Sequence, residues 1–251
     1  MRMCAGNRAI IYCSTTDPYQ VIRHPDPARQ AELSKHSRLV VRRSLELILA
    51  RSTLNVRVLT RSPLAKSDFD LFEAFGKRLT FGMSLPTLRD DLSRFYEPKA
   101  PGPRQRLAAL REASRAGLNV FVAMAPTYPE CDPVDLEATL QAVADLNPIT
   151  VFHEPINIRA DNVQRIQARA TEMGAKLNTE VSASRLDWQR YAMEALLTVH
   201  RIAQKVGLGD RLHSWPDKSL GTLAVANALG QPDRHMEFIY DNWNRISEWP
   251  R

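Results

Sequence analysis

RQRLAALREASRAGLNVFVAMAPTYP, residues 104–129, is the stretch that decides the fold. Its first half, residues 104–116, carries apolar side chains at helical spacing and closes at Gly117, a residue that commonly follows the last turn of a helix. Its second half, residues 119–124 (NVFVAM), is a short run rich in Val and Phe, as expected of a strand buried on both faces. A helix that leads directly into such a strand is typical of an α/β protein with a parallel sheet.

The same alternation runs through most of the chain. Four more strands are predicted at residues 9–14 (AIIYCS), 55–60 (NVRVLT), 79–84 (LTFGMS) and 149–153 (ITVFH). Amphipathic helices are predicted between and after them, at residues 37–51, 67–75, 104–116, 134–146, 161–173 and 186–206. The predicted class is α/β, with a barrel-like core over residues 1–180 and a C-terminal helical extension over residues 181–251.

Composition narrows the class of protein. The 251 residues are 44% hydrophobic with no long uncharged apolar run, which excludes a membrane helix and leaves the cytoplasm as the expected compartment. Cys4, Cys13 and Cys131 are odd in number and widely spaced, so they form neither a disulfide framework nor a metal-ligand motif. The net charge of +6 is compatible with a nucleic-acid partner, although the arginines are spread along the whole chain.

Polar residues follow each predicted strand, where the carboxyl edge of a parallel sheet holds its ligands. These segments are residues 14–20 (STTDPYQ), 60–63 (TRSP), 84–87 (SLPT), 125–129 (APTYP) and 153–157 (HEPIN). Hydroxyls, one guanidinium and two carboxylates at a common rim suit a polar ligand that carries a carboxylate, an ammonium and ribose hydroxyls. Ser, Thr and Asp before a helix are also good N-caps, so each residue alone has a structural alternative.

The order and spacing of these segments carry a family resemblance. STTDPYQ (14–20), LTRSPL (59–64), MSLPTL (83–88) and the long segment 97–129 together resemble the radical S-adenosylmethionine (SAM) enzymes of the spore photoproduct lyase-like group, also called DNA repair photolyase-like. The resemblance is clear over residues 9–157. The later segment 212–220 (LHSWPDKSL) is less diagnostic.

The resemblance implies a partial (β/α)6 TIM-like barrel that binds SAM across the carboxyl ends of its strands. A [4Fe-4S] cluster, held by a C-x3-C-x2-C loop and reduced by a donor such as flavodoxin or ferredoxin, would cleave SAM to a 5'-deoxyadenosyl radical. The implied reaction is a lyase or repair step, with DNA as the candidate substrate.

Site residues follow from the same resemblance. It places Ser14, Thr15, Thr16 and Asp17 near the methionyl end of SAM, Arg61 close to the methionyl group, and Ser84 facing SAM from the next strand; Glu154 and Asn157 follow a strand and could reach SAM or substrate. Cys13 lies near a position where the family has a hydrogen-donating cysteine, and a buried structural thiol is the alternative.

The chain departs from the family at the cluster. It contains no C-x3-C-x2-C motif, and its first predicted strand corresponds to the second strand of a six-strand core. We therefore expect that the first βα unit is missing, through a fragment or late start, or because this is a cluster-less relative or split subunit completed by a partner chain. This chain alone is then expected to be inactive.

Two functions from different classes stay open at this point. One is a truncated radical SAM enzyme, and the other is a SAM-binding or scaffold protein without radical chemistry. An acid/base enzyme that uses Asp17 and Glu154 has little support, because no nucleophile or metal set accompanies them. The four tryptophans of the C-terminal part, Trp188, Trp215, Trp243 and Trp249, either stack bases or seal a helical layer.

Overall fold

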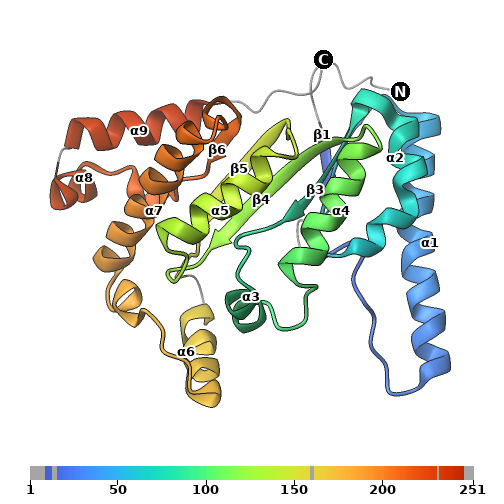
Figure 1. Ribbon diagram of the computed structural model, residues 1–251, viewed down its shortest axis with the longest axis horizontal. Coiled ribbons are helices and arrows are strands. Elements are labelled where there is room, and N and C mark those ends of the chain that lie inside the picture. The colour runs from blue at the N-terminus through green and yellow to red at the C-terminus, as the bar shows by residue number, and fades with distance from the viewer. Residues whose placement is uncertain (1–8, 13–15, 159–160, 231, 246–251) are drawn as a thin grey trace.

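The computed structural model describes residues 9–12, 16–158, 161–230 and 232–245. Within these ranges six strands form a single sheet in which each strand pairs in parallel with the next along the chain (Figure 1). They are β1 (Ala9–Tyr12), β2 (Asn55–Thr60), β3 (Leu79–Ser84), β4 (Asn119–Thr127), β5 (Thr150–Pro155) and β6 (Leu212–Ser214). The strand order follows the chain, as in a (β/α) barrel that has not closed.

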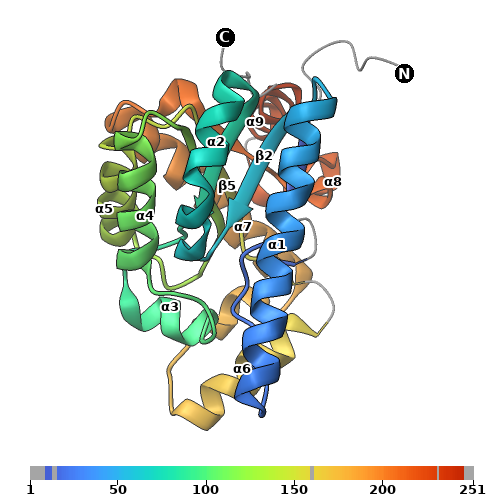
Figure 2. The same ribbon diagram turned by 90° about the vertical axis from the view of Figure 1, so that its right-hand side faces the viewer.

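Five helices cover one face of the sheet, and the other helices in the described part of the chain lie at its ends and edges (Figures 1 and 2). The covering helices are α1 (Pro27–Arg51), α2 (Phe69–Phe75), α4 (Pro103–Arg115), α5 (Pro133–Ala144) and α7 (Arg185–Lys205). At the carboxyl ends of the strands lie α3 (Asp90–Tyr96) and α6 (Asn162–Met173), and α8 (Leu223–Leu229) and α9 (Pro232–Asn244) follow β6. This arrangement confirms the predicted α/β class and partial barrel.

Successive side chains of a strand point to opposite faces of the sheet, and the two faces pack against different groups. Val56 and Val58 of β2 join the main apolar core under the helices, whereas Arg57 between them lies on the opposite face. The guanidinium carbon of Arg57 is 5.0 Å from the ring centre of Phe152 on β5, three strands away. The side chain of Arg57 therefore extends across the inner face to the rings of Phe121 on β4 and Phe152 on β5.

Gly82 of β3 leaves room on the inner face for an aromatic ring. A Cβ atom at Gly82 would lie 2.6 Å from the ring of Phe121, which packs directly over the glycine from β4. The ring of Phe121 in turn meets the ring of Phe152, with centres 5.8 Å apart and planes at 79°. Aromatic rings from neighbouring strands therefore fill the inner face where the missing side chain leaves room.

Several boundaries differ from the sequence prediction. α1 begins at Pro27, ten residues before the predicted start at residue 37, because Asp26 caps it through Ala28 N and Pro27 occupies its first turn. β6 was not predicted as a strand, because three residues are too few to show a period. Residues 181–251 are therefore not purely helical, since β6 pairs with β5.

Helix α3 was also missed, because its seven residues give only a weak helical signal. In the described part of the chain, no helix combines the length and apolar character needed to cross a membrane.

Candidate functional site

Asp17 ties the loop after β1 to the end of β2. Its carboxylate accepts hydrogen bonds from the Thr60 hydroxyl at 2.5 Å, the Arg61 backbone N–H at 2.6 Å and the Tyr19 backbone N–H at 2.9 Å. Thr16, next to it, is exposed. Asp17, predicted to contact a ligand, thus uses its oxygens to hold the backbone that carries Arg61.

Arg61 belongs to an ion triad at the carboxyl edge. Its guanidinium pairs with Glu97, which follows α3, and the other oxygen of Glu97 lies 2.6 Å from the guanidinium of Arg106 on α4. Arg106 is only 1% exposed and also donates to the carbonyls of Ser84, at 3.0 Å, and Pro101, at 2.7 Å. Two guanidinium groups share one carboxylate, so the triad carries a net charge of +1.

A cavity of about 410 Å³ opens beside this triad. Arg61, Glu97 and Tyr128 line it from the sheet side, and Asn162 and Arg165 line it from α6, with Tyr96, Pro126, Ile156, Asp161 and Ile166 completing the wall. The volume falls in the range of about 300–1,000 Å³ that is usual for small-molecule pockets. An excess positive charge next to a cavity of this size favours a ligand with an anionic group.

Tyr128 forms the inner wall of the cavity. Its ring stacks on Tyr96, with centres 3.9 Å apart and planes 3° from parallel, and Tyr96 donates its hydroxyl to Glu130 at 2.6 Å. The hydroxyl of Tyr128 is buried and has no hydrogen-bond partner among the described residues. Burial, with Glu97 nearby, raises the pKa of Tyr128, so this hydroxyl stays protonated as a donor.

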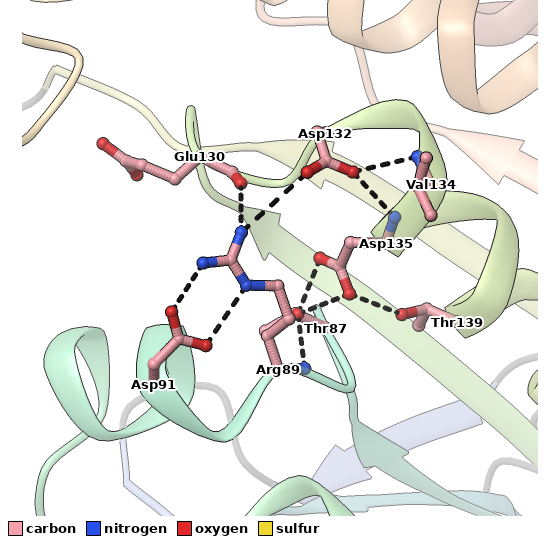
Figure 3. A network of polar contacts seen from close by, with 8 residues as sticks. All are labelled: Thr87, Arg89, Asp91, Glu130, Asp132, Val134, Asp135 and Thr139. Carbon is pink, nitrogen blue, oxygen red and sulfur yellow. Dashed lines mark hydrogen bonds and ion pairs between the residues drawn. The ribbon is translucent and has the colours of Figure 1, made fainter.

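The loops on either side are fixed by a polar network (Figure 3). The hydroxyl of Thr87, after β3, donates to both oxygens of the buried Asp135 at 2.9 and 2.7 Å. Arg89 pairs with Asp91 of α3 and donates to the Glu130 carbonyl, while Asp132 caps the start of α5. The network joins the β3–α3 loop to the β4–α5 loop, so it stiffens the cavity rim.

The remaining predicted contacts have partners inside the protein. Ser84 is 1% exposed, and its hydroxyl donates to the Ala125 carbonyl at 3.1 Å. Asn157 donates to Asp217 at 3.0 Å, and Glu154 is half-buried on the inner face of β5. Of the predicted set, Arg61 is the residue that lines the 410 Å³ cavity.

Three predicted residues, Cys13, Ser14 and Thr15, lie outside the described residues. Cys131 is described and buried, and burial raises the pKa of its thiol to about 12, so it remains a neutral thiol. No group of three or more His, Cys, Asp or Glu side chains that could hold a metal occurs among the residues with described positions. These residues do not fit a [4Fe-4S] cluster, which needs thiolate ligands.

His153 is a structural histidine in the described fold. It is fully buried, its Nε2 lies 3.0 Å from the Thr127 hydroxyl, and burial lowers its pKa to about 3. The ring is therefore neutral at physiological pH. Its outward position, on the helix side of β5, keeps it away from the inner face.

Sequence reasoning missed Glu97 and Arg106, and it included Tyr128 only as a member of the predicted rim segment 125–129. Glu97 begins the segment 97–129, whose pattern carries the family resemblance, but its pairing with Arg61 and Arg106 depends on the course of the chain around α3 and α4. A usable signal was Arg106 itself, because it lies on the same face of its helix as the buried Leu110, a position where a charge needs a partner.

These features define an α/β protein with a partial parallel barrel and an anion-attracting cavity at the carboxyl edge of its strands. Among solved structures, that of a spore photoproduct lyase mutant with bound AdoMet and dinucleoside spore photoproduct is similar, with a TM-score of 0.56 and 16% identity over 81% of this chain and 59% of that one. A second mutant of that enzyme has a TM-score of 0.54, 16% identity and coverage of 72% and 56%. The similarity shows a shared fold.

Comparison of amino-acid sequences does not identify a family for this chain. An uncharacterized protein, ORF301 of Acidianus two-tailed virus, is 29% identical over 166 residues, which is 64% of this chain and 50% of that protein. No model of a protein family matches the chain. This chain spans between half and three fifths of the length of the proteins that it resembles.

Proposed function

We propose that this chain binds SAM at the carboxyl edge of its sheet, with the SAM carboxylate paired to Arg61. The observation that carries the proposal is the triad of Arg61, Glu97 and Arg106, whose net charge of +1 lies against the 410 Å³ cavity. A guanidinium can bind a carboxylate through two parallel hydrogen bonds. The spore photoproduct lyase structure with bound AdoMet supports this choice of ligand for the shared fold.

Each residue has a defined part in this binding. Arg61 supplies the charge that meets the carboxylate, and Glu97 orients the guanidinium. Arg106 keeps Glu97 compensated, so that Arg61 retains its attraction for an anion. Asp17 fixes the backbone of Arg61, and Tyr128 presents a buried hydroxyl beside the cavity.

The reaction that we propose is a radical SAM lyase or repair reaction, with DNA as the substrate. The bound cluster would supply the electron that cleaves SAM. Because the described residues do not fit that cluster, its thiolate ligands must come from another segment or from a partner chain. The contribution of this chain is to bind and orient SAM and to shape the site, with flavodoxin or ferredoxin as the class of electron donor.

Binding is tested by isothermal titration of SAM into the wild-type chain and Arg61→Met. We expect the variant to bind SAM at least about tenfold more weakly, because a charge-assisted hydrogen bond contributes about 1.5–3 kcal/mol. Glu97 remains paired with Arg106 in this variant, so the fold is preserved. Arg111→Met, an exposed change on the outer helix α4, is the matched control and should leave the affinity unchanged. Equal affinities for all three proteins would disprove the assigned contact.

The second candidate is a SAM-binding protein without radical chemistry, which would use the same contact between Arg61 and the SAM carboxylate at the cavity. The chain is incubated anaerobically with iron, sulfide, a reductant and SAM, and 5'-deoxyadenosine is measured. This chain alone is expected to form no 5'-deoxyadenosine under either candidate, because the radical proposal takes its thiolate ligands from another segment or a partner chain. The second candidate is supported if SAM binds and 5'-deoxyadenosine is still absent when a protein that supplies those ligands is added. Formation of 5'-deoxyadenosine supports the radical reaction.

A further inference from the structure

A row of three aromatic rings crosses the inner face of the sheet. Phe121 of β4, Phe152 of β5 and Trp215, directly after β6, follow one another with ring centres 5.8 Å and then 4.7 Å apart. Phe121 and Phe152 are 1% and 3% exposed, whereas Trp215 is 49% exposed. The row thus begins inside the barrel and ends in an indole that is open to solvent.

Trp215 is fixed in place although it is exposed. Its backbone N–H donates to the His153 carbonyl at 2.8 Å, which continues the pairing of β6 with β5. Its indole lies against Phe152 with the planes 31° apart. One side of the indole is therefore packed, and a rigid aromatic surface remains available at the carboxyl end of the inner face.

The other two tryptophans with described positions, Trp188 and Trp243, pack within the helical part of the chain. Trp188 is 3% exposed within the cluster that joins α7 to α9 and donates to the Ile156 carbonyl at 2.8 Å. Trp243 donates to the Pro216 carbonyl at 3.0 Å and packs over Gly221. Both seal helical layers, and Trp249 lies outside the described residues. Trp215 is the described tryptophan that belongs to the inner face.

Two guanidinium groups and the half-buried carboxylate of Glu154 share that face with Trp215. The guanidinium carbon of Arg57 lies 5.0 Å from the ring centre of Phe152, the neighbour of Trp215 in the row. Arg61, four residues further along the chain, follows the same strand and belongs to the triad of net charge +1. A planar aromatic ligand joined to an anionic group matches this combination, because the ring can stack while the anion meets the guanidinium groups.

We propose that Trp215 is a stacking platform for a nucleobase. Two sources share this chemistry: the adenine of SAM and a pyrimidine of a nucleic-acid substrate. With adenine the proposal rests on the proposed function and extends it to the other end of the ligand. With a pyrimidine it describes a separate substrate contact that needs no SAM.

The test is equilibrium dialysis of the full chain with two labelled probes, S-adenosylhomocysteine and the dinucleotide d(TpT). Wild type is compared with Trp215→Leu, which keeps an apolar contact for Phe152, and with Trp215→Phe, which keeps a ring. We expect Trp215→Leu to weaken the binding of one probe about tenfold and Trp215→Phe to weaken it less, because a stacked base contributes about 1–3 kcal/mol. The affected probe identifies the source of the base.

Tyr240→Leu is the matched control, because Tyr240 is also 49% exposed but lies on α9. It should leave both affinities unchanged, and circular dichroism melting confirms that each variant is folded. Two results overturn the platform: wild type that binds neither probe, or Trp215→Leu with wild-type affinity for both. If Arg61→Met weakens S-adenosylhomocysteine binding while Trp215→Leu does not, the platform fails and the SAM proposal stands; the reverse pattern rejects the Arg61 contact alone.

Discussion

Removing the carboxylate of Glu97 should destabilise the protein far more than removing Arg61, the more exposed of its two partners. Glu97→Ala leaves the guanidinium of Arg106, 1% exposed, without a counter-charge. An unpaired buried charge costs about 3–5 kcal/mol. Arg106 keeps its hydrogen bonds to the Ser84 and Pro101 carbonyls, so we expect a loss near the lower end, about 3 kcal/mol of unfolding free energy.

Arg61→Met tests the same triad from its exposed side. The side chain of Arg61 is 33% exposed, and its removal leaves Glu97 and Arg106 paired at 2.6 Å. A pair as accessible to water as this contributes about 0–1 kcal/mol. The two single variants should therefore differ by about 2 kcal/mol or more in unfolding free energy.

The assay is urea denaturation at pH 7, followed by far-UV circular dichroism with a check that the slope of the transition is unchanged. The double variant Glu97→Leu with Arg106→Met is the internal control, since apolar replacement of a buried pair often restores stability. It should recover most of the loss seen in Glu97→Ala. Equal losses for Glu97→Ala and Arg61→Met would refute the reasoning, because they would show that Arg106 does not depend on Glu97.

Three further predictions concern the fold. Burial lowers the pKa of His153 to about 3, against about 6.5 in the unfolded chain. The unfolded state therefore takes up a proton first, and the unfolding free energy falls as the pH drops from about 6.5 towards 3. Between pH 7 and pH 5, denaturation curves should show a smaller loss of unfolding free energy for His153→Gln, which can still bond Thr127, than for wild type. Gly82→Ala should lower the unfolding free energy by about 1–3 kcal/mol, because the new methyl group meets the Phe121 ring, and a thermal melt that matches wild type would contradict this contact. Tyr128→Phe should leave the melting temperature unchanged or raise it, since the lost hydroxyl has no partner among the described residues; a marked drop would mean that the hydroxyl is bonded.

Most of the sheet could be predicted from sequence, because the residues of each strand show a recognisable strand pattern on their own. Residues 55–60 and 79–84 were predicted as strands with the same bounds that β2 and β3 have in the structure. Both runs are short, rich in β-branched or aromatic residues and bounded by turn residues, so nothing outside them was needed. β6 could not be found this way, because its three residues become a strand only through pairing with β5.

The candidate site was harder to predict from sequence than the sheet, because its key contacts join residues that are far apart in the chain. Arg61 could be singled out, since it follows a strand at the carboxyl edge. Its partner Glu97 lies beyond β3 and α3, and the buried Arg106 comes from the next helix. Local patterns carry no information about which carboxylate meets which guanidinium, so the charge of the triad emerged only from the fold.

Asp17 has a structural role at the carboxyl edge, and the ligand contact predicted for it from sequence stays a prediction. The sequence placed it at the carboxyl edge, and there it accepts hydrogen bonds from Thr60 and the Arg61 backbone. Asp17 and the segment TRSP, more than 40 residues apart, therefore act as one structural unit in which Asp17 holds the backbone of Arg61. A ligand that depends on Arg61 depends on Asp17 as well, although the carboxylate need never touch it.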